Sequence, residues 1–465
     1  MPSPKGSTPT SLAFPCLQNS MENQHVAVIA FPFGSHLMPL LNLVLKLAHA
    51  APHSSFSFIG THKSNAILFP KPHIPNNINH YSISDGIPEG HVLGNDPTEK
   101  LDLFLKTGPQ NLHKGIQLAE ADTKKKVTCI IADAFVASSL HVAQTLNVPW
   151  IAVWLPNSCS LSLYFYTDLI RRHCTNHAAK TTLDFLPGLS KMRVEDIPHD
   201  LLVVGEKETI FSRTLVSLGE VLPQAKAVVM NFFEELDPPL FVQDMRSKLQ
   251  SLLYVVPLPS PLLPLSDNDS GGILSWLDRK SGRSVVYVCF GTVVAPPPHE
   301  LVAVAEALEE SGFPFLWSLK EAVMGGLPHG FVERTKMRGK VVSWAPQNQV
   351  LAHDSIGVFL THCGFNSVTE SVSSGVPMIC RPFFGDQGIS ARVIEDIWEN
   401  GVIIEGRAFT KNALLKSLNL ILVQEEGKKI RESALKAKKT VEDAIRPEGP
   451  AAKDFNTLLE IISRS

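Results

Sequence analysis

Short apolar runs rich in Val, Ile and Phe recur along the chain, and helical patterns separate them. This alternation constrains the fold most strongly, because continuous apolar strands that alternate with helices form parallel sheets covered on both faces. The sequence therefore predicts an α/β protein built on doubly wound parallel sheets. The runs occupy residues 25–33, 55–61, 127–135, 150–155, 227–233, 284–291, 313–319, 340–345, 355–364 and 375–384.

A segment dense in Pro and Ser, PLPSPLLPLSDNDSGG at residues 257–272, divides these runs into two sets. We interpret it as a linker, and a chain of 465 residues is long enough for two hydrophobic cores. The predicted domains are an N-terminal one over 25–256 and a C-terminal one over 273–445. Residues 1–24 are expected to form a disordered extension, and residues 446–465 a helix that packs back on the N-terminal domain. Ligands bind at the carboxyl ends of such strands, so both sheets are expected to face one cleft.

Composition excludes several classes of protein. The formal net charge of −3 argues against a nucleic-acid surface, which needs a basic face or stripe. No apolar run approaches the ~18 residues that a membrane span requires. The seven cysteines are scattered without a CxxC pair, which indicates unpaired thiols in a reducing compartment. We therefore expect a cytoplasmic protein, and we expect it to be a monomer.

The run THCGFNSVTES, residues 361–371, lies where an apolar strand ends and a helix begins, near Asn366. Unpaired backbone N–H groups and the positive end of the helix dipole meet there, which favours an anion such as a phosphate. From this fragment alone, a capping box in which Ser367 and Glu370 satisfy the helix end is an equally good interpretation. A zinc site is disfavoured, because His362 and Cys363 are adjacent and no second ligand pair follows at zinc spacing.

Two polar residues stand at strand ends in the N-terminal half. His36 follows the first apolar run at a Gly-containing turn, and Asp133 closes the run at 127–135. Taken alone, His36 is better interpreted as an exposed turn or cap histidine, and for Asp133 a helix N-cap is an equally good interpretation. Two such strand ends in one parallel sheet can lie side by side, so these residues can meet.

The stretch WAPQNQVLAHDSIGVFLTHCGFNSVTESVSSGVPMICRPFFGDQ, from Trp344 to Gln387, resembles the signature box of the plant family 1 glycosyltransferases, which transfer sugars from UDP-sugars. The segments AFPFGSH, FGTVVAPPPHE, GFPFLWS and RPFFGDQ are most similar to the flavonoid and anthocyanidin 3-O-glucosyltransferases of that family. The resemblance implies a GT-B fold, in which two Rossmann-like domains face a cleft. The N-terminal domain would bind the acceptor and the C-terminal domain the UDP-sugar. It also implies metal-independent chemistry with a UDP-sugar as co-substrate, no further cofactor and a small phenolic acceptor.

The same resemblance implies roles for individual residues. His36 would be the catalytic base and Asp133 the carboxylate that orients it. An acceptor hydroxyl with a pKa near ~10 is a poor nucleophile at neutral pH, so the reaction needs such a base. The UDP-sugar would contact Thr292, Ser318, Trp344, Ala345, Gln347, His362, Gly364, Asn366, Ser367, Glu370, Asp386 and Gln387. Within this set, Trp344 would stack on uracil, Glu370 would bind the ribose, and Asp386 and Gln387 would bind the sugar. The acceptor pocket would include Phe33, Phe135, Tyr164 and Phe384.

Three positions depart from the family pattern. Phe365 stands where the box commonly has Trp, so an indole N–H is lost. Leu155 stands where the flavonoid 3-O relatives tend to carry a Thr that contacts the sugar, and Tyr164 where relatives often carry His. Gln387 favours glucose over galactose, because galactose users in the family tend to carry His at this position.

The expected activity is inverting transfer of a hexose, glucose by preference, to a hydroxyl of a flavonoid-like phenol. Attack through a ring carbon, which gives a C-glycoside, stays open, as does a non-catalytic nucleotide-sugar or flavonoid-binding protein. The chain has neither Gly-x-Gly-x-x-Gly nor Gly-x-Ser-x-Gly, which disfavours a dehydrogenase and a hydrolase. The Asp-x-Asp pattern at 267–269 lies in the linker and is expected to be a solvated turn, so no metal site is predicted.

Overall fold

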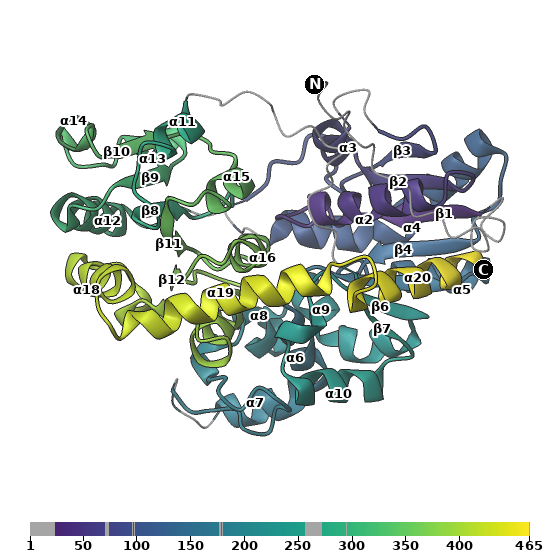
Figure 1. Cartoon of the computed structure of the whole chain (residues 1–465). Helices are drawn as coiled ribbons and strands as arrows, with labels where there is room; N and C mark the ends of the chain where they lie inside the picture. Colours follow the sequence, from purple (N-terminus) through teal and green to yellow (C-terminus); the bar gives the residue numbers. More distant parts are fainter. Residues whose placement is uncertain are drawn as a thin grey trace, which may run out of the picture.

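The computed structural model describes residues 24–69, 74–94, 96, 98–175, 178, 180–255, 272–293 and 295–464. These residues form two parallel sheets, each packed against helices (Figure 1). The predicted doubly wound α/β class is therefore confirmed. The predicted N-terminal extension up to residue 23, and the predicted linker up to residue 271 with its Asp-x-Asp pattern, lie outside the described residues. The domain limits stay a prediction.

The first sheet has the strand order β3-β2-β1-β4-β5-β6-β7, and its strands pair in parallel. The order reverses between β1 and β4, which makes this point the topological switch of the sheet. The strands are β1 (His25–Ile29), β2 (Ser55–Thr61), β3 (Ile78–Ile83), β4 (Cys129–Asp133), β5 (Trp150–Trp154), β6 (Ala227–Met230) and β7 (Leu252–Tyr254). The helices of this half are α2 (Leu37–Ala50), α3 (His62–Leu68), α4 (Glu99–Thr123), α5 (Ser139–Leu146), α6 (Leu161–Phe165), α7 (Thr167–Thr175), α8 (His199–Leu202), α9 (Ile210–Val221) and α10 (Pro239–Lys248).

The second sheet repeats this arrangement, with the order β10-β9-β8-β11-β12-β13 and a switch point between β8 and β11. Its strands are β8 (Val285–Cys289), β9 (Phe315–Ser318), β10 (Gly339–Val342), β11 (Ile356–Thr361), β12 (Met378–Cys380) and β13 (Gly401–Ile403). The helices of this half are α11 (Ile273–Leu277), α12 (Pro298–Ser311), α13 (Glu321–Met324), α14 (Phe331–Thr335), α15 (Gln347–Leu351), α16 (Phe365–Ser374), α17 (Gln387–Arg392) and α18 (Lys411–Leu422).

Both faces of each sheet are buried, which explains why the central strands are apolar at successive positions. In β1, Val26 and Val28 pack into one hydrophobic cluster, while Ala27 and Ile29 pack into the cluster on the opposite face. Successive side chains of a strand point to opposite faces, so a strand covered on both sides needs no polar alternation.

The chain returns from the second half to the first through its last two helices. In Figure 1, α19 (Gly427–Ala444) runs from the second half toward the first, and α20 (Pro450–Ser463) lies over the first sheet. Phe455, Leu458 and Ile462 of α20 pack into the cluster that contains Val26 and Val28. The Asp454 carboxylate also accepts the N–H of Tyr254 in β7 at 2.7 Å. These contacts tie the C-terminal helix to the first sheet.

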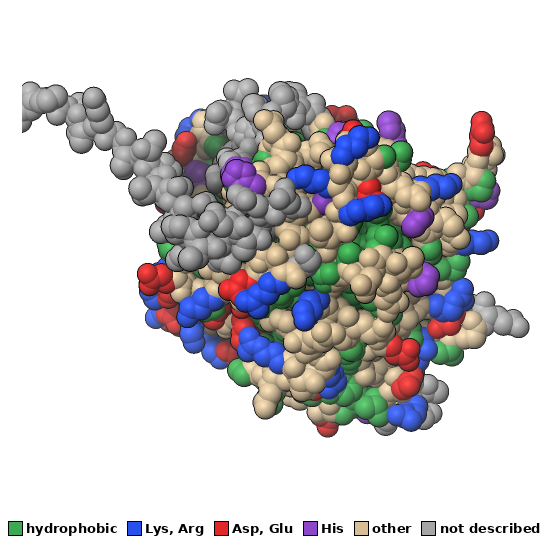
Figure 2. All heavy atoms as spheres, turned by 90° about the vertical axis from the view of Figure 1, so that its right-hand side faces the viewer, with side chains coloured by type: hydrophobic (Ala, Val, Ile, Leu, Met, Phe, Trp, Pro, Cys, Tyr) green, Lys and Arg blue, Asp and Glu red, His purple; other side chains and the backbone are tan. Residues whose placement is uncertain are grey.

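The surface of the first half carries basic and acidic side chains in mixture, as the face in Figure 2 shows. This mixture agrees with the small net charge of −3. Within the described ranges, every helix is too short or too polar to cross a membrane.

Candidate active site

His36 and Asp133 flank the switch point of the first sheet. His36 directly precedes α2, and Asp133 is the last residue of β4. Because β1 and β4 are neighbours in parallel register, the two side chains emerge at the same edge. The Nδ1 atom of His36 lies 2.7 Å from Oδ2 of Asp133, so the structure brings together the two residues predicted from strand ends.

The environment of this pair favours a proton on the imidazole. Only 16% of the His36 side chain and 1% of the Asp133 side chain are exposed. Burial lowers the pKa of His36, but the Asp133 carboxylate, helped by Asp386, outweighs burial and leaves this pKa raised. The second oxygen of Asp133 accepts the N–H of Phe135 at 2.9 Å, which fixes the carboxylate. With Nδ1 held by Asp133, Nε2 is the atom that can accept a proton from a substrate.

Aromatic rings surround the imidazole of His36. The ring centres of Phe135 and Phe31 lie 5.0 and 5.3 Å from it. Phe33 packs on Phe31 at 5.2 Å and on Phe104 at 5.7 Å. Of the predicted acceptor set, the structure therefore places Phe135 next to the His36 imidazole and Phe33 one ring further away, against Phe31. Sequence reasoning missed Phe31, although the alternation in AFPF placed it beside Phe33.

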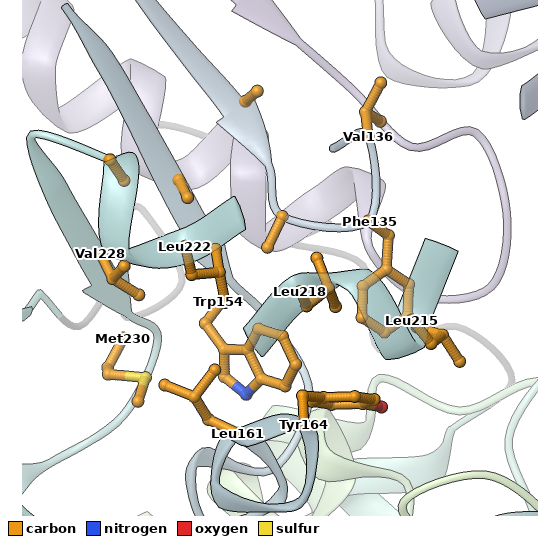
Figure 3. Packing of buried hydrophobic residues seen from close by; sticks show 14 of the residues in the cluster. Phe135, Val136, Trp154, Leu161, Tyr164, Leu215, Leu218, Leu222, Val228 and Met230 are labelled. Atoms are coloured by element: carbon orange, nitrogen blue, oxygen red, sulfur yellow. The ribbon is translucent and has the colours of Figure 1, made fainter. Parts of the chain in front are cut away.

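The other two predicted acceptor residues lie in different settings. The Tyr164 ring packs edge-on against Trp154 at 5.4 Å, below Phe135 in the view of Figure 3. Burial, together with Asp386 and Asp200, raises the pKa of Tyr164, so its hydroxyl stays protonated. Phe384 is half-exposed on the segment between β12 and α17.

The predicted anion site lies at the start of α16, next to the switch point of the second sheet. The helix begins at Phe365 with Gly364 as its N-cap, and no side chain caps it. The Val368 N–H donates to the Gly364 carbonyl at 3.1 Å, and the N–H groups of residues 365–367 lie ahead of this bond in the first turn of the helix. The capping-box interpretation is wrong, because Ser367 and Glu370 both accept hydrogen bonds from the Gln347 side chain instead.

His362, which follows β11, is held between two glycines. A Cβ atom added to Gly291 would lie 2.8 Å from the His362 ring, and one added to Gly364 would lie 3.0 Å from Cε1 and closer to Nε2. Carbon atoms prefer separations of about 3.5–4.0 Å, so the imidazole explains why residue 364 has no side chain. Burial lowers the pKa of His362 to about 4, so this ring is neutral near pH 7. A neutral imidazole donates a single N–H.

The residues predicted to bind the nucleoside lie after β10 and on α16. Trp344 is 60% exposed, so its indole face is accessible, whereas Ala345 is buried. The Gln347 amide donates to Ser367 Oγ at 2.9 Å and to Glu370 Oε2 at 2.6 Å. Burial raises the pKa of Glu370 to about 7.

Tyr287 was missed from the sequence. Its hydroxyl donates to Gln347 Oε1 at 3.2 Å and so helps to orient this amide. Nothing in the sequence separates Tyr287 from the other core residues of β8. The two predicted hydroxyl residues lie nearby in the fold: Thr292 is exposed in the turn after β8, and Ser318 ends β9.

Asp386 and Gln387 lie at the start of α17, and backbone N–H groups hold both of their side chains. The Asp386 carboxylate accepts the N–H of Asn157 at 2.7 Å, and burial raises the pKa of this carboxyl. Gln387 Oε1 accepts the N–H groups of Phe383 at 2.9 Å and Phe384 at 3.3 Å. The amide nitrogen of Gln387 is therefore the end that can donate to a ligand.

Asn157 is a further residue that sequence reasoning missed. It lies two positions beyond Leu155, to which the departure from the family pattern drew attention. Leu155 is buried among apolar side chains of the first half, and Asn157 makes the polar contact across the junction. Its side chain forms an Asx turn with the N–H of Cys159 at 2.9 Å, and a Pro-Asn pair after a strand could have indicated this turn.

The two switch points meet through one direct contact. The side-chain amide of Asn366, in the first turn of α16, donates to the carbonyl of Ser35 at 3.0 Å. Ser35 precedes His36, so the predicted base and the predicted anion site at the start of α16 lie at one junction. In the part of the chain that the structure describes, no group of three or more His, Cys, Asp or Glu side chains could hold a metal ion.

Two Rossmann-like halves, with a hydrogen-bonded His–Asp pair at one switch point and a helix start without a side-chain cap at the other, are the arrangement expected of a transferase of the GT-B class. Comparison with known proteins agrees. The family model described as UDP-glucoronosyl and UDP-glucosyl transferase matches residues 105–443. The chain belongs to this family.

Its relatives cover almost the whole chain. A flavonol 3-O-glucosyltransferase of Actinidia chinensis var. chinensis is 45% identical over 444 residues, which are 94% of this chain and 96% of that protein. An anthocyanidin 3-O-galactosyltransferase of the same plant is 44% identical over 454 residues, 96% and 99% of the two chains. The crystal structure of a UDP-glucose: anthocyanidin 3-O-glucosyltransferase in complex with UDP is 74% identical. It covers 96% of this chain and all of that one, with a TM-score of 0.94. These findings confirm the resemblance predicted from the signature box.

Proposed function

We propose that this enzyme transfers glucose from UDP-glucose to a phenolic hydroxyl of a flavonoid, with inversion at the anomeric carbon. The observation that carries the proposal is the His36–Asp133 pair at 2.7 Å, one residue from the Ser35 carbonyl that Asn366 contacts. A base thus stands beside a helix end suited to a diphosphate. The names of the flavonol and anthocyanidin relatives support a flavonoid acceptor, and two of the three support glucose as the donor sugar.

In the proposed reaction, Nε2 of His36 takes the proton from the acceptor hydroxyl as its oxygen attacks the anomeric carbon. The bond between that carbon and the diphosphate oxygen breaks, and UDP leaves with the electron pair. Asp133 stabilises the imidazolium that forms, which is the same electrostatic effect that raises the pKa of His36. The neighbouring Phe31 and Phe135 rings limit water around the imidazole and offer flat surfaces to a polyphenol.

The second half would hold the donor. The N–H groups at the start of α16 point to where the diphosphate would lie and stabilise the charge that develops on the leaving group. The neutral His362 would add one N–H donor. Trp344 would stack on uracil, and the Glu370 carboxylate would accept hydrogen bonds from the ribose hydroxyls. Thr292 and Ser318 would add hydroxyl donors.

Recognition of the sugar would fall to Asp386 and Gln387. Because Gln387 Oε1 already accepts two backbone N–H groups, the side chain would present its amide N–H groups to a sugar hydroxyl. Asp386 keeps one carboxylate oxygen on Asn157 and could accept a sugar hydroxyl with the other. We further propose a cytoplasmic monomer, since one chain supplies both the base and the diphosphate site, and no disulfide joins the six cysteines of the described part.

The test compares the wild-type protein with His36→Ala and with His49→Ala, a control near the opposite end of α2. UDP-glucose, UDP-galactose, UDP-rhamnose and UDP-glucuronate are each offered with a flavonol and an anthocyanidin, and products are identified by mass spectrometry. We expect a glucoside from UDP-glucose, its formation reduced by about 10²- to 10⁴-fold in His36→Ala. Isothermal titration calorimetry should show UDP affinity retained in both variants.

Three outcomes would contradict the proposal. UDP binding without any glycoside in the wild-type protein would identify a binding protein. A strong preference for UDP-galactose would contradict the role of Gln387. A product that resists acid hydrolysis would be a C-glycoside and would show attack through carbon.

A further inference from the structure

Helix α17 belongs to the second half, yet it contacts the first half along its whole length. At its start, Asp386 accepts the N–H of Asn157 at 2.7 Å. One turn later, the Asn157 side chain donates to Ser390 Oγ at 3.3 Å. Between them, a Cβ atom added to Gly388 would lie 2.6 Å from the carbonyl oxygen of Asp196, so the two backbones are in direct contact. Helix α17, which begins at the proposed sugar-binding residues Asp386 and Gln387, is therefore docked on the first half.

The last residue of α17, Arg392, forms a buried ion pair with the first half. Its Nε donates to Asp196 Oδ2 at 3.0 Å, and Asp196 lies in the first half at the end of a short 3₁₀ turn, Val194–Asp196. The Arg392 side chain is 2% exposed and that of Asp196 is fully buried. Asp196 also accepts the backbone N–H of Arg193 at 2.8 Å, which fixes its carboxylate in the first half.

Further charges complete the cluster around Arg392. The next turn of the chain is π-helical, Val393–Ile397, and it brings Glu395 and Asp396 to Arg392 Nη1 at 2.8 and 2.9 Å. Glu195 lies 3.5 Å from Arg392 Nη2. Arg407 of the second half pairs with Asp196 as well. Carboxylates from both halves thus converge on one guanidinium. Among side chains, only Arg has a planar set of five N–H donors that can bind several carboxylates together.

Such a buried cluster is a poor source of net stability, because removing several charges from water costs much of what their attraction returns. It is, however, a strict geometric constraint. The planar guanidinium can donate to all of these carboxylates only in one orientation, so Arg392 fixes both the rotation of α17 and its distance from the Val194–Asp196 turn.

We propose that Arg392 and Asp196 are positioning residues that hold the sugar-recognition pair, Asp386 and Gln387, in register with the base His36. The inference rests on the proposed glucosyl transfer. The proposal distinguishes the binding of UDP from the transfer of glucose. Binding of UDP uses side chains of the second half, whereas reaction requires the glucose at α17 to face the imidazole of the first half.

Three variants and one control test this separation. Arg392→Gln removes the positive charge, and Arg392→Lys keeps this charge but loses the planar set of N–H donors. Asp196→Asn keeps the size of the side chain but removes its negative charge. The matched control is Arg334→Gln, which breaks an exposed two-bond pair with Glu309 at 2.6 and 2.9 Å. For each protein we would measure UDP affinity by calorimetry, kcat and KM with UDP-glucose, and the midpoint of thermal unfolding.

We expect UDP affinity to stay within about twofold in all variants that fold, because the UDP contacts lie outside the cluster. We expect kcat/KM for UDP-glucose to fall on the order of 10- to 100-fold in Arg392→Gln and Asp196→Asn, since a misplacement of about 1 Å can cost this much. Arg392→Lys should restore the unfolding midpoint more than it restores kcat/KM. Arg334→Gln should match the wild-type protein in every measurement.

The proposal would be overturned if folded Arg392→Gln transferred glucose at the wild-type rate, or if UDP affinity fell in parallel with transfer. The second result would show that the cluster only holds the second half together. If Arg392→Gln does not fold, Asp196→Asn decides between these results. Absence of transfer in the wild-type protein would instead refute the proposed function.

Discussion

The substitution Gly364→Ala tests the geometry of the diphosphate site with one added carbon atom. The backbone at Gly364 has φ −61° and ψ 133°, which any residue can adopt, so the substitution adds no backbone strain. The new Cβ would lie 3.0 Å from His362 Cε1 and closer still to Nε2. Ordinary carbon contacts are about 3.5–4.0 Å, so the imidazole would have to move by roughly 1 Å. Gly291 also lies against this ring, because a Cβ atom added there would lie 2.8 Å from Cε1 and from Nε2.

Two effects follow, and their sizes can be stated. Overpacking of a buried ring costs about 1–3 kcal/mol in the free energy of unfolding. Loss of the His362 hydrogen bond to a charged diphosphate costs about 1.5–3 kcal/mol of binding. That loss corresponds to UDP affinity weaker by about 10- to 100-fold, because each 1.4 kcal/mol is a factor of about ten. Calorimetric titration with UDP and denaturant unfolding measure the two effects separately.

The design includes two controls. Gly325→Ala adds a Cβ that meets no atom within 4 Å, at a φ of −63°, and should leave both measurements unchanged. In a His362→Ala background the ring is gone, so the stability penalty of Gly364→Ala should shrink to the small effect expected at a helix N-cap. The reasoning is refuted if Gly364→Ala binds UDP as the wild-type protein does, or if its full penalty persists without the imidazole.

Three further predictions concern the proposed base, ribose and sugar contacts. The Asp133 carboxylate raises the pKa of His36, and the base must be neutral, so kcat/KM should fall as the pH drops through this pKa. In Asp133→Asn the fall of kcat/KM at acid pH should move to lower pH, and the maximal rate should drop on the order of 10²- to 10⁴-fold. A pH–rate profile of each protein measures both effects. Hydrogen bonds from the ribose hydroxyls favour the ionised form of Glu370, whose pKa is about 7 in the free protein. UDP binding should therefore release protons from Glu370, and UDP affinity should increase from pH 6 to pH 8. Calorimetry in two buffers measures the proton release, which Glu370→Gln should abolish. Gln387→Glu keeps the oxygen that accepts the Phe383 and Phe384 N–H groups but loses the amide donor. KM for UDP-glucose should therefore rise about tenfold, with unchanged UDP affinity. An unaltered KM would show that Gln387 does not contact the sugar.

The sequence by itself determined the local features of this protein. Central strands such as β1 and β4 are buried on both faces, so their continuous apolar runs were visible without a structure. Strands β3, β7 and β13 were missed. All three lie at sheet edges. In β3 only the two end residues are buried, and β7 and β13 have three residues each. An edge strand has a partner on one side only, so its sequence carries a weaker signal.

The tertiary structure alone decided which residues meet. His36 and Asp133 are 97 positions apart, Asn366 and Ser35 are 331 apart, and Arg392 and Asp196 are 196 apart. Strand order and the docking of the two halves set these pairings, and both depend on the packing of many distant side chains at once. Local patterns in the sequence carry no record of such distances. For this reason the signature box indicated residues for a donor site, but the contacts of Asn157, Tyr287 and Arg392 emerged only from the folded chain.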